Sequence, residues 1–232
     1  MPVSGKKIWK GLSWAVLAAV IPLMPASAEL SVSQLIVEVQ SSATTTDIEI
    51  ANNSSERSYI AVEPREILAP GSASERPFVS PDPAALGLIA SPARMVLEPR
   101  QRRTIRLAAI SSELQRERVY RVTVKPVAGD VSSDESGLKL LVGYDLLVLV
   151  RPTKPVLALV AKSDEHGLTL TNNGNASVEL SDGKQCDKSG AACNPLPSKR
   201  LYAGASWTQA IPTGAVGEYR VRSADGWSTL KF

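Results

Sequence analysis

The two cysteines of the chain, Cys186 and Cys193, are the residues best placed for covalent chemistry. The turn-rich run DKSGAA separates them, so a short loop brings their side chains together. In an exported protein, a close pair of this kind forms a disulfide. Zinc binding is the other chemistry that cysteines support, but it needs further ligands, and the sequence has no second ligand pair. We therefore predict a disulfide between Cys186 and Cys193 and no metal site.

The rest of the sequence offers little catalytic chemistry. The single histidine, His166, lies in the turn-like run SDEHG, where it is either a general base or a solvated turn residue, and nothing in the sequence marks a partner for a base. There is no nucleophile elbow, zinc-protease motif or phosphate-binding glycine loop. Trp207 and Trp227 would either bind sugar or pack a core, and we expect them in the core. The sequence thus predicts a protein that is not an enzyme and needs no cofactor.

The N-terminal segment has the three parts of a secretory signal. Its basic part consists of Lys6, Lys7 and Lys10. An apolar run, Trp14–Met24, and a small-residue site ending in Ala28 follow, so we predict cleavage after Ala28. The alternative is a membrane anchor, but Pro22 and Pro25 interrupt the run, which is shorter than the roughly 20 residues of a membrane span. We expect export without stable membrane insertion.

Charge excludes nucleic acid as a partner. The full sequence has 26 basic and 23 acidic residues, a formal net charge of +3. The segment 1–28 contains three lysines and no acidic residue, so 23 basic residues face 23 acidic ones in the remainder. A nucleic-acid-binding protein needs a basic face that neutralises phosphates, and this chain has no such excess.

Short alternating strands separated by turn residues dominate the chain. In the first part, strands are expected at 35–39, 47–51, 59–63, 94–97, 103–108 and 119–125. In the second part, they are expected at 156–160, 168–171, 177–180, 206–211 and 218–222. The proline-containing run 151–155 is a linker candidate, and 112–117 would form one helical turn at most. The pattern predicts an all-β chain with two sandwich domains, at 29–152 and 153–232.

The segment 138–152, with the sequence LKLLVGYDLLVLVRP, is the most unusual of these elements. All its even positions from Leu138 to Val150 are apolar or aromatic, whereas the odd positions are mixed. Because side chains alternate between the faces of a strand, this pattern predicts one strand of roughly 45 Å with a wholly apolar face. Such a strand at the edge of a sheet invites pairing by another chain.

Taken in order, these features resemble the periplasmic chaperones of chaperone–usher pili. The resemblance covers residues 29–232. It rests on IEIANN (48–53), SPAR (91–94), LEP (97–99), TIRL (104–107), YRV (120–122), VRP (150–152) and LTNNGNA (170–176). It implies two immunoglobulin-like β-sandwich domains in tandem, set at an angle, and a location in the periplasm.

The resemblance also implies a mechanism and partners. In that family, pilus subunits lack their last strand, and the chaperone lends its own long strand before passing the subunit to an outer-membrane usher. Here the lent side chains would be Leu138, Leu140 and Val142, with Tyr144 as a further candidate, and Leu146, Val148 and Val150 would pack the first domain. The alternative is that the whole row is ordinary core.

One departure from the family concerns the subunit's C-terminal carboxylate. Familiar members hold it with an Arg on the first strand and a Lys near the end of the long strand. Those places fall near Ile36 and at Leu147 in this sequence, and neither residue is basic. Arg121 and Lys125, on the neighbouring strand, are candidate substitutes, and the alternative for each is a solvated strand face.

Two further hypotheses concern structure and class. Arg106 and Glu117 are expected to form an ion pair that ties two strands together. A two-domain immunoglobulin-like pilus or surface structural protein is the alternative to a chaperone, and a sugar-binding or hydrolytic sandwich enzyme is a third class. A subunit would carry its apolar donor strand at the N-terminus, whereas this strand is internal, which favours the chaperone.

Overall fold

The computed structural model describes residue 1 and residues 29–40, 45–110, 113–127, 141–164, 167–187, 192–212 and 216–232. The predicted signal segment therefore lies outside the described residues, as do Leu138, Leu140 and His166. Within the described part, nearly all regular structure is β-strand, and the predicted all-β fold with two sandwich domains is confirmed.

The first sandwich consists of two sheets. One sheet contains, in order, β1 (Leu30–Val32), β3 (Thr45–Asn52), β8 (Arg102–Ala109) and β6 (Leu88–Ser91). The other contains β2 (Ile36–Gln40), β10 (Tyr144–Arg151), β9 (Arg118–Val127), β4 (Ser58–Leu68) and β5 (Arg76–Phe78), and β7 (Arg94–Leu97) also pairs with β4. A four-residue helix, α1 (Pro83–Leu86), precedes β6.

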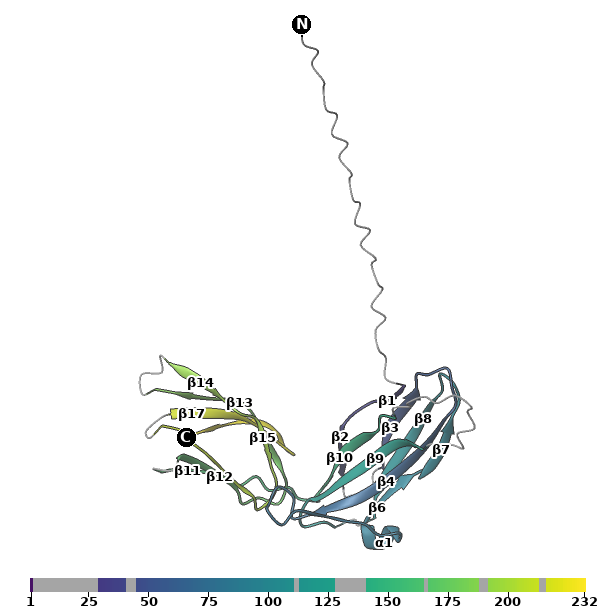
Figure 1. Ribbon diagram of the computed structural model, residues 1–232. Helices are drawn as coiled ribbons and strands as arrows, with labels where there is room; N and C mark the ends of the chain where they lie inside the picture. The colour runs from purple at the N-terminus through teal and green to yellow at the C-terminus, as the bar shows by residue number, and fades with distance from the viewer. Residues whose placement is uncertain are drawn as a thin grey trace.

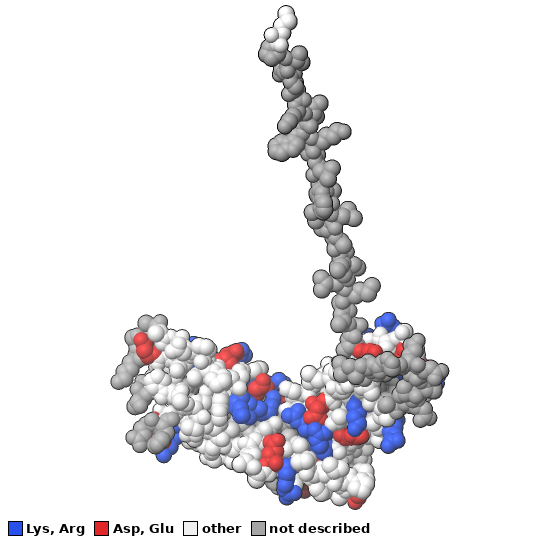
Figure 2. All heavy atoms as spheres, in the orientation of Figure 1, with Lys and Arg blue, Asp and Glu red and all other residues white. Residues whose placement is uncertain are grey.

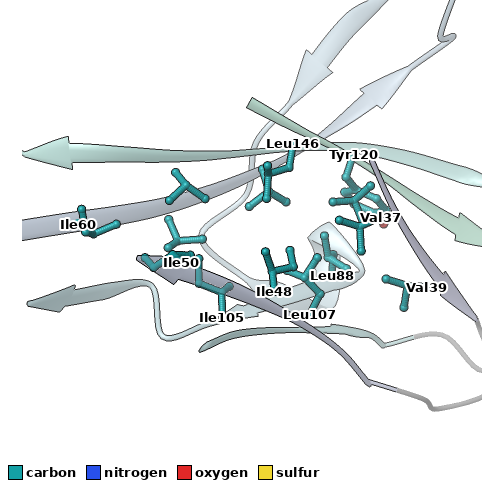
Figure 3. Packing of buried hydrophobic residues seen from close by; sticks show 14 of the residues in the cluster. Val37, Val39, Ile48, Ile50, Ile60, Leu88, Ile105, Leu107, Tyr120 and Leu146 are labelled. Atoms are coloured by element: carbon teal, nitrogen blue, oxygen red, sulfur yellow. The ribbon is translucent and has the colours of Figure 1, made fainter. Parts of the chain in front are cut away.

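The core of this sandwich follows from the alternation of its strands. In β8, Ile105 and Leu107 are fully buried, while Thr104 and Arg106 on the opposite face are exposed. The apolar rows of the two sheets face each other, as Figure 3 shows for Ile48 and Leu107 on one side and Leu146 on the other. Tyr120 also lies in this core, and its hydroxyl donates to the Leu86 carbonyl at 3.0 Å.

The second sandwich is smaller. One sheet contains β11 (Leu159–Asp164), β12 (Gly167–Asn172) and β16 (Ser206–Gln209). The other contains β14 (Cys193–Leu196), β13 (Val178–Cys186), β17 (Val216–Ser223) and β18 (Gly226–Lys231), with β15 (Lys199–Leu201) also paired to β13. Cys186 and Cys193 are register partners in the β13–β14 pair and form a disulfide, which confirms the predicted bond.

Two expectations from the sequence need correction. The long strand begins at Tyr144, because residues 141–143 pair with no strand. Trp207 packs partly against the second core, but Trp227 is 55% exposed, because it lies on the outer face of the edge strand β18.

The two sandwiches meet only near one end of each and diverge from there, so the molecule is bent (Figure 1). The space-filling view shows a hollow between its two arms, which we call the cleft (Figure 2). Strands β2 and β10 lie on the side of the first sandwich that faces this cleft. Basic and acidic side chains gather around the place where the two sandwiches meet (Figure 2).

Candidate binding cleft and donor segment

Strand β10 is the central element of the cleft. It pairs in parallel with β2 and antiparallel with β9. Its even side chains, Leu146, Val148 and Val150, are fully buried in the first core, as the sequence predicts. Its odd side chains Leu147 and Leu149 are also buried, in a second cluster to which Tyr202 of the other sandwich contributes.

The chain that leads into β10 is the candidate donor segment. Tyr144 packs against the first core, and its hydroxyl donates to the Leu30 carbonyl at 2.8 Å. Val142, the next side chain of the same parity, is 55% exposed, and Leu141 is 39% exposed. The buried part of this row of side chains therefore ends at Tyr144. Beyond it, the apolar side chains of the segment are exposed.

The two positions that would carry the family's basic pair are neighbours in space. Ile36 and Leu147 are register partners in the β2–β10 pair. Ile36 is 48% exposed, whereas Leu147 is 7% exposed and packs in the cluster that contains Tyr202. A lysine at 147 would place an ammonium group among apolar side chains, which is costly without a partner. Leucine at this position instead joins the two sandwiches by apolar contact.

The candidate anchor residues Arg121 and Lys125 differ in their surroundings. Arg121 is the register partner of Leu147 on β9, so it lies beside the position of the missing lysine. Its Nε is 3.9 Å from an Asp145 carboxylate oxygen. Lys125 lies further along β9 and pairs with Glu63, at 2.8 Å between Nζ and Oε2. Arg121 is thus the candidate at the cleft, and Lys125 lies nearer the donor segment.

A buried ion-pair network fixes the junction between the sandwiches. The Arg151 guanidinium contacts the Glu117 carboxylate and donates to the Ser177 carbonyl at 3.2 Å and to Glu38 Oε1 at 2.9 Å. Glu117 in turn accepts from the Ser177 backbone N–H at 3.2 Å. The side chains of Arg151 and Glu117 are 3% and 2% exposed. Residue 151, expected in a linker, therefore ends β10 and clamps both domains.

The electrostatics of this network follow from its geometry. Burial would raise the pKa of Glu38, but the hydrogen bonds and charge of Arg151 outweigh it and hold this pKa below 4.5. Burial would lower the pKa of Arg151, but Glu38 and Glu117 keep it raised. Glu38 and Arg151 are therefore both charged at neutral pH.

The predicted Arg106–Glu117 pair is wrong. Arg106 lies on the exposed face of β8 and forms a bidentate pair with Asp47, its register partner on β3, at 2.8 Å for each hydrogen bond. Glu117 lies at the domain junction and pairs with Arg151 instead. Proximity along the chain was a poor guide here, because cross-strand register decides which side chains meet.

Sequence reasoning did not find Glu38, Tyr202, Arg65 and Asp145. Each is an ordinary strand or turn residue whose partner lies in another element, so no spacing within the chain marks it. One Arg65 nitrogen, Nη2, donates to both Asp145 carboxylate oxygens, at 2.9 Å each. Only the order of the strands brings these two residues, 80 positions apart, onto one sheet face.

Neither a metal centre nor a membrane span is found in the described part of the chain. No group of three or more His, Cys, Asp or Glu side chains there is arranged to hold a metal ion. No helix there is long and apolar enough to cross a membrane.

Comparisons with known proteins agree with this geometry. Residues 29–156 match the family "Pili and flagellar-assembly chaperone, PapD N-terminal domain". A fimbrial subunit protein of the CS1 type from Escherichia coli is 26% identical over 191 residues, which cover 77% of this chain and 79% of that protein.

Solved structures extend the likeness to both sandwiches. The class 5 fimbriae chaperone CfaA has a TM-score of 0.69 at 19% identity, covering 87% of this chain and 98% of that one. A complex of a chaperone with a tip adhesion subunit, CsuC–CsuE of Acinetobacter baumannii, has a TM-score of 0.59 at 15% identity, covering 88% and 98%. At these identities the structures show a shared two-domain fold.

Proposed function

The chain belongs to the family of pilus- and flagellum-assembly chaperones, and from this we propose that it binds pilus subunits in the periplasm by donor-strand complementation. It then delivers them to an outer-membrane usher. The protein is not an enzyme on this proposal, because it uses only binding free energy. The predicted signal segment supports the periplasmic location, and a solved relative with a bound tip subunit supports the class of partner.

The proposal rests on one observation: the row of alternate apolar side chains that fills the first core extends along the chain past the edge of that core. Leu146, Val148 and Val150 fill the first sandwich, Tyr144 closes its end, and Val142 follows with the same parity in solvent. Leu140 and Leu138 continue the parity in the sequence. A sandwich that lacks a strand needs such a row, because an added strand supplies main-chain hydrogen bonds and its alternate side chains fill the open core.

Exposed apolar residues beside the donor segment belong to the same proposed subunit-binding surface. Leu35 and Ile36, at the start of β2, are 55% and 48% exposed. The Leu35 carbonyl accepts from the Leu147 backbone N–H at 2.9 Å, so these residues lie beside the start of β10. An incoming subunit would cover them together with the donor segment. Arg121 and Lys125 remain the proposed groups for its C-terminal carboxylate.

Co-expression with the pilus subunits of the source organism tests this function. The double variant Leu140→Asp/Val142→Asp should lose the purified chaperone–subunit complex. Burying each aliphatic side chain contributes about 1.5–3 kcal/mol, so losing two weakens binding by at least about 100-fold. The matched control is Lys139→Asp/Leu141→Asp, which alters the opposite face of the same segment and should retain the complex. Undiminished complex with the first variant would refute strand donation by this segment.

A further inference from the structure

A cavity of about 380 Å³ lies where the two sandwiches meet. Its walls are the end of β4 with the turn that follows (66–70), the start of β9 (116–119) and residues 203–205 of the second sandwich. Strands β9 and β10 separate β4 from β2 in the sheet, so the cavity is distinct from the β2–β10 surface that faces the cleft. Small-molecule sites are commonly cavities of roughly 300–1,000 Å³ where two domains meet. This cavity has the size and the place of such a site.

The walls of the cavity are apolar and held in place. The turn after β4 is fixed by its own hydrogen bonds, such as that from the Gly71 N–H to the Glu75 carboxylate at 2.6 Å. A Cβ on Gly71 would lie 3.0 Å from the Tyr202 ring, so this turn rests on the second sandwich. Val119 is buried, and Ile67 packs in the same cluster. The cavity therefore exists before any ligand binds, which lowers the cost of binding.

Four charged residues line the cavity, and salt bridges neutralise three of them. Arg118 donates to both Glu66 carboxylate oxygens, at 2.7 and 2.5 Å. The Glu117 carboxylate faces Arg151 instead, and its side chain is 2% exposed. Arg116 has no acidic partner in the part of the chain that the structure describes. The cavity therefore carries one uncompensated positive charge.

The second sandwich determines where the Arg116 guanidinium lies. Its Nη2 donates to the Ala203 carbonyl at 2.5 Å. A Cβ on Gly204 would clash with the same nitrogen, so glycine at this position leaves room for the guanidinium against the 203–205 segment. A guanidinium has five N–H donors, and this contact uses one of them. Because Arg116 is exposed, its other donors are accessible to a ligand.

We propose that this cavity binds a small amphipathic anion and that Arg116 binds its charged group. The ligand class is a compact apolar body with one carboxylate or sulfonate, because the cavity offers apolar walls and one free cation. Both sandwiches line the cavity, so a bound ligand contacts both and stabilises their arrangement. The site is separate from the proposed subunit-binding surface, and the inference stands without that proposed function.

The probe 2-naphthoate tests the site, with 2-naphthamide as its uncharged comparison. Binding is followed by NMR shifts of the Arg116 Nε–H and of the backbone amides at 203–205. The acid should bind at least about tenfold more tightly than the amide, as expected for a hydrogen bond to a charged group. Arg116→Gln should remove this preference. Because the ligand binds the folded protein, the acid should also raise the midpoint of thermal unfolding.

Arg76→Gln is the matched control. Arg76 is exposed on the neighbouring strand β5, where it is the register partner of Leu68, but it does not line the cavity. This variant should keep the preference for the acid, and thermal unfolding without ligand shows that each variant folds. Equal binding of acid and amide, the same preference in Arg116→Gln as in the wild type, or shifts confined to the exposed residues 141–142 would overturn the inference.

Discussion

Two opposing effects act on the pKa of the Glu38 carboxyl group. Burial disfavours its charged form, but Arg151 donates two hydrogen bonds to it, at 2.9 and 3.3 Å, and holds its pKa below 4.5. The unfolded chain therefore binds more protons than the folded one as the solution is acidified. The stabilisation by Glu38 is present above pH 4.5 and is lost as the pH falls through the lower, folded-state pKa.

Glu38→Gln tests this linkage. At pH 7 the variant should have a lower free energy of unfolding than the wild type, because a neutral amide replaces the charge that faces Arg151. Between about pH 5 and pH 3 the wild type should lose this advantage, so the two curves converge. Urea unfolding at several pH values measures the difference. A gap that stays constant down to pH 3 would contradict the assignment.

Strand β10 shows how far a sequence pattern determines an element. The burial of its even side chains was predictable, because strict alternation of apolar residues fixes one face. The burial of Leu147 and Leu149 was not, since Tyr202, which covers them, comes from the other domain. The start of the strand was also missed. A Cβ on Gly143 would lie 3.0 Å from the Lys125 Cβ, so close backbone contact marks the point where the chain joins the sheet.

The same limit applies to the candidate site. The donor row was readable from parity, and the cysteine pair from its spacing. Arg65 and Asp145 were not, because their contact depends on the order of β4, β9 and β10 in the sheet. Glu117 was assigned the wrong arginine for the same reason. A local sequence pattern determines which face of a strand each side chain lies on. Which side chain of another strand it meets depends on the order of the strands in the sheet.

Leu147→Lys tests whether position 147 could hold the basic residue that the family resemblance implies there. The substitution restores the basic residue but buries its stem and charge in the cluster with Tyr202, so it should destabilise the protein by about 1–3 kcal/mol. Urea unfolding measures this cost. Leu141→Lys, which changes an exposed leucine on the approach to the same strand, should lie within about 0.5 kcal/mol of the wild type. Equal stability of Leu147→Lys and the wild type would show that position 147 tolerates an anchor lysine.

The bent shape of the molecule depends on the junction between the two sandwiches. Arg151 binds groups of both domains, and Glu117, next to the start of β9, accepts from Ser177 of the second. Further backbone contacts cross the same region, such as the Glu117 N–H to the Asn175 carbonyl at 2.8 Å. These directional bonds hold the two sandwiches at the angle to each other that Figure 1 shows.

Arg151→Met tests the role of the clamp. It leaves Glu117 buried without its cation, so the protein should lose about 3–5 kcal/mol and the two domains should hold a wider range of angles. Urea unfolding measures the first effect, and small-angle X-ray scattering measures the second as an increased radius of gyration. Arg57→Met, which breaks the exposed Arg57–Glu98 pair, is the control and should change neither. Scattering identical to the wild type would show that other contacts set the angle.

Backbone amide hydrogen exchange across residues 138–143 tests the central claim most directly. A donated strand forms main-chain hydrogen bonds with the subunit, so exchange in this segment should slow by at least about 100-fold on formation of the complex. The amides of β10 at 146–150, which already pair with β2 and β9, should change little. A complex that forms while exchange at 138–143 stays as in the free protein would contradict strand donation.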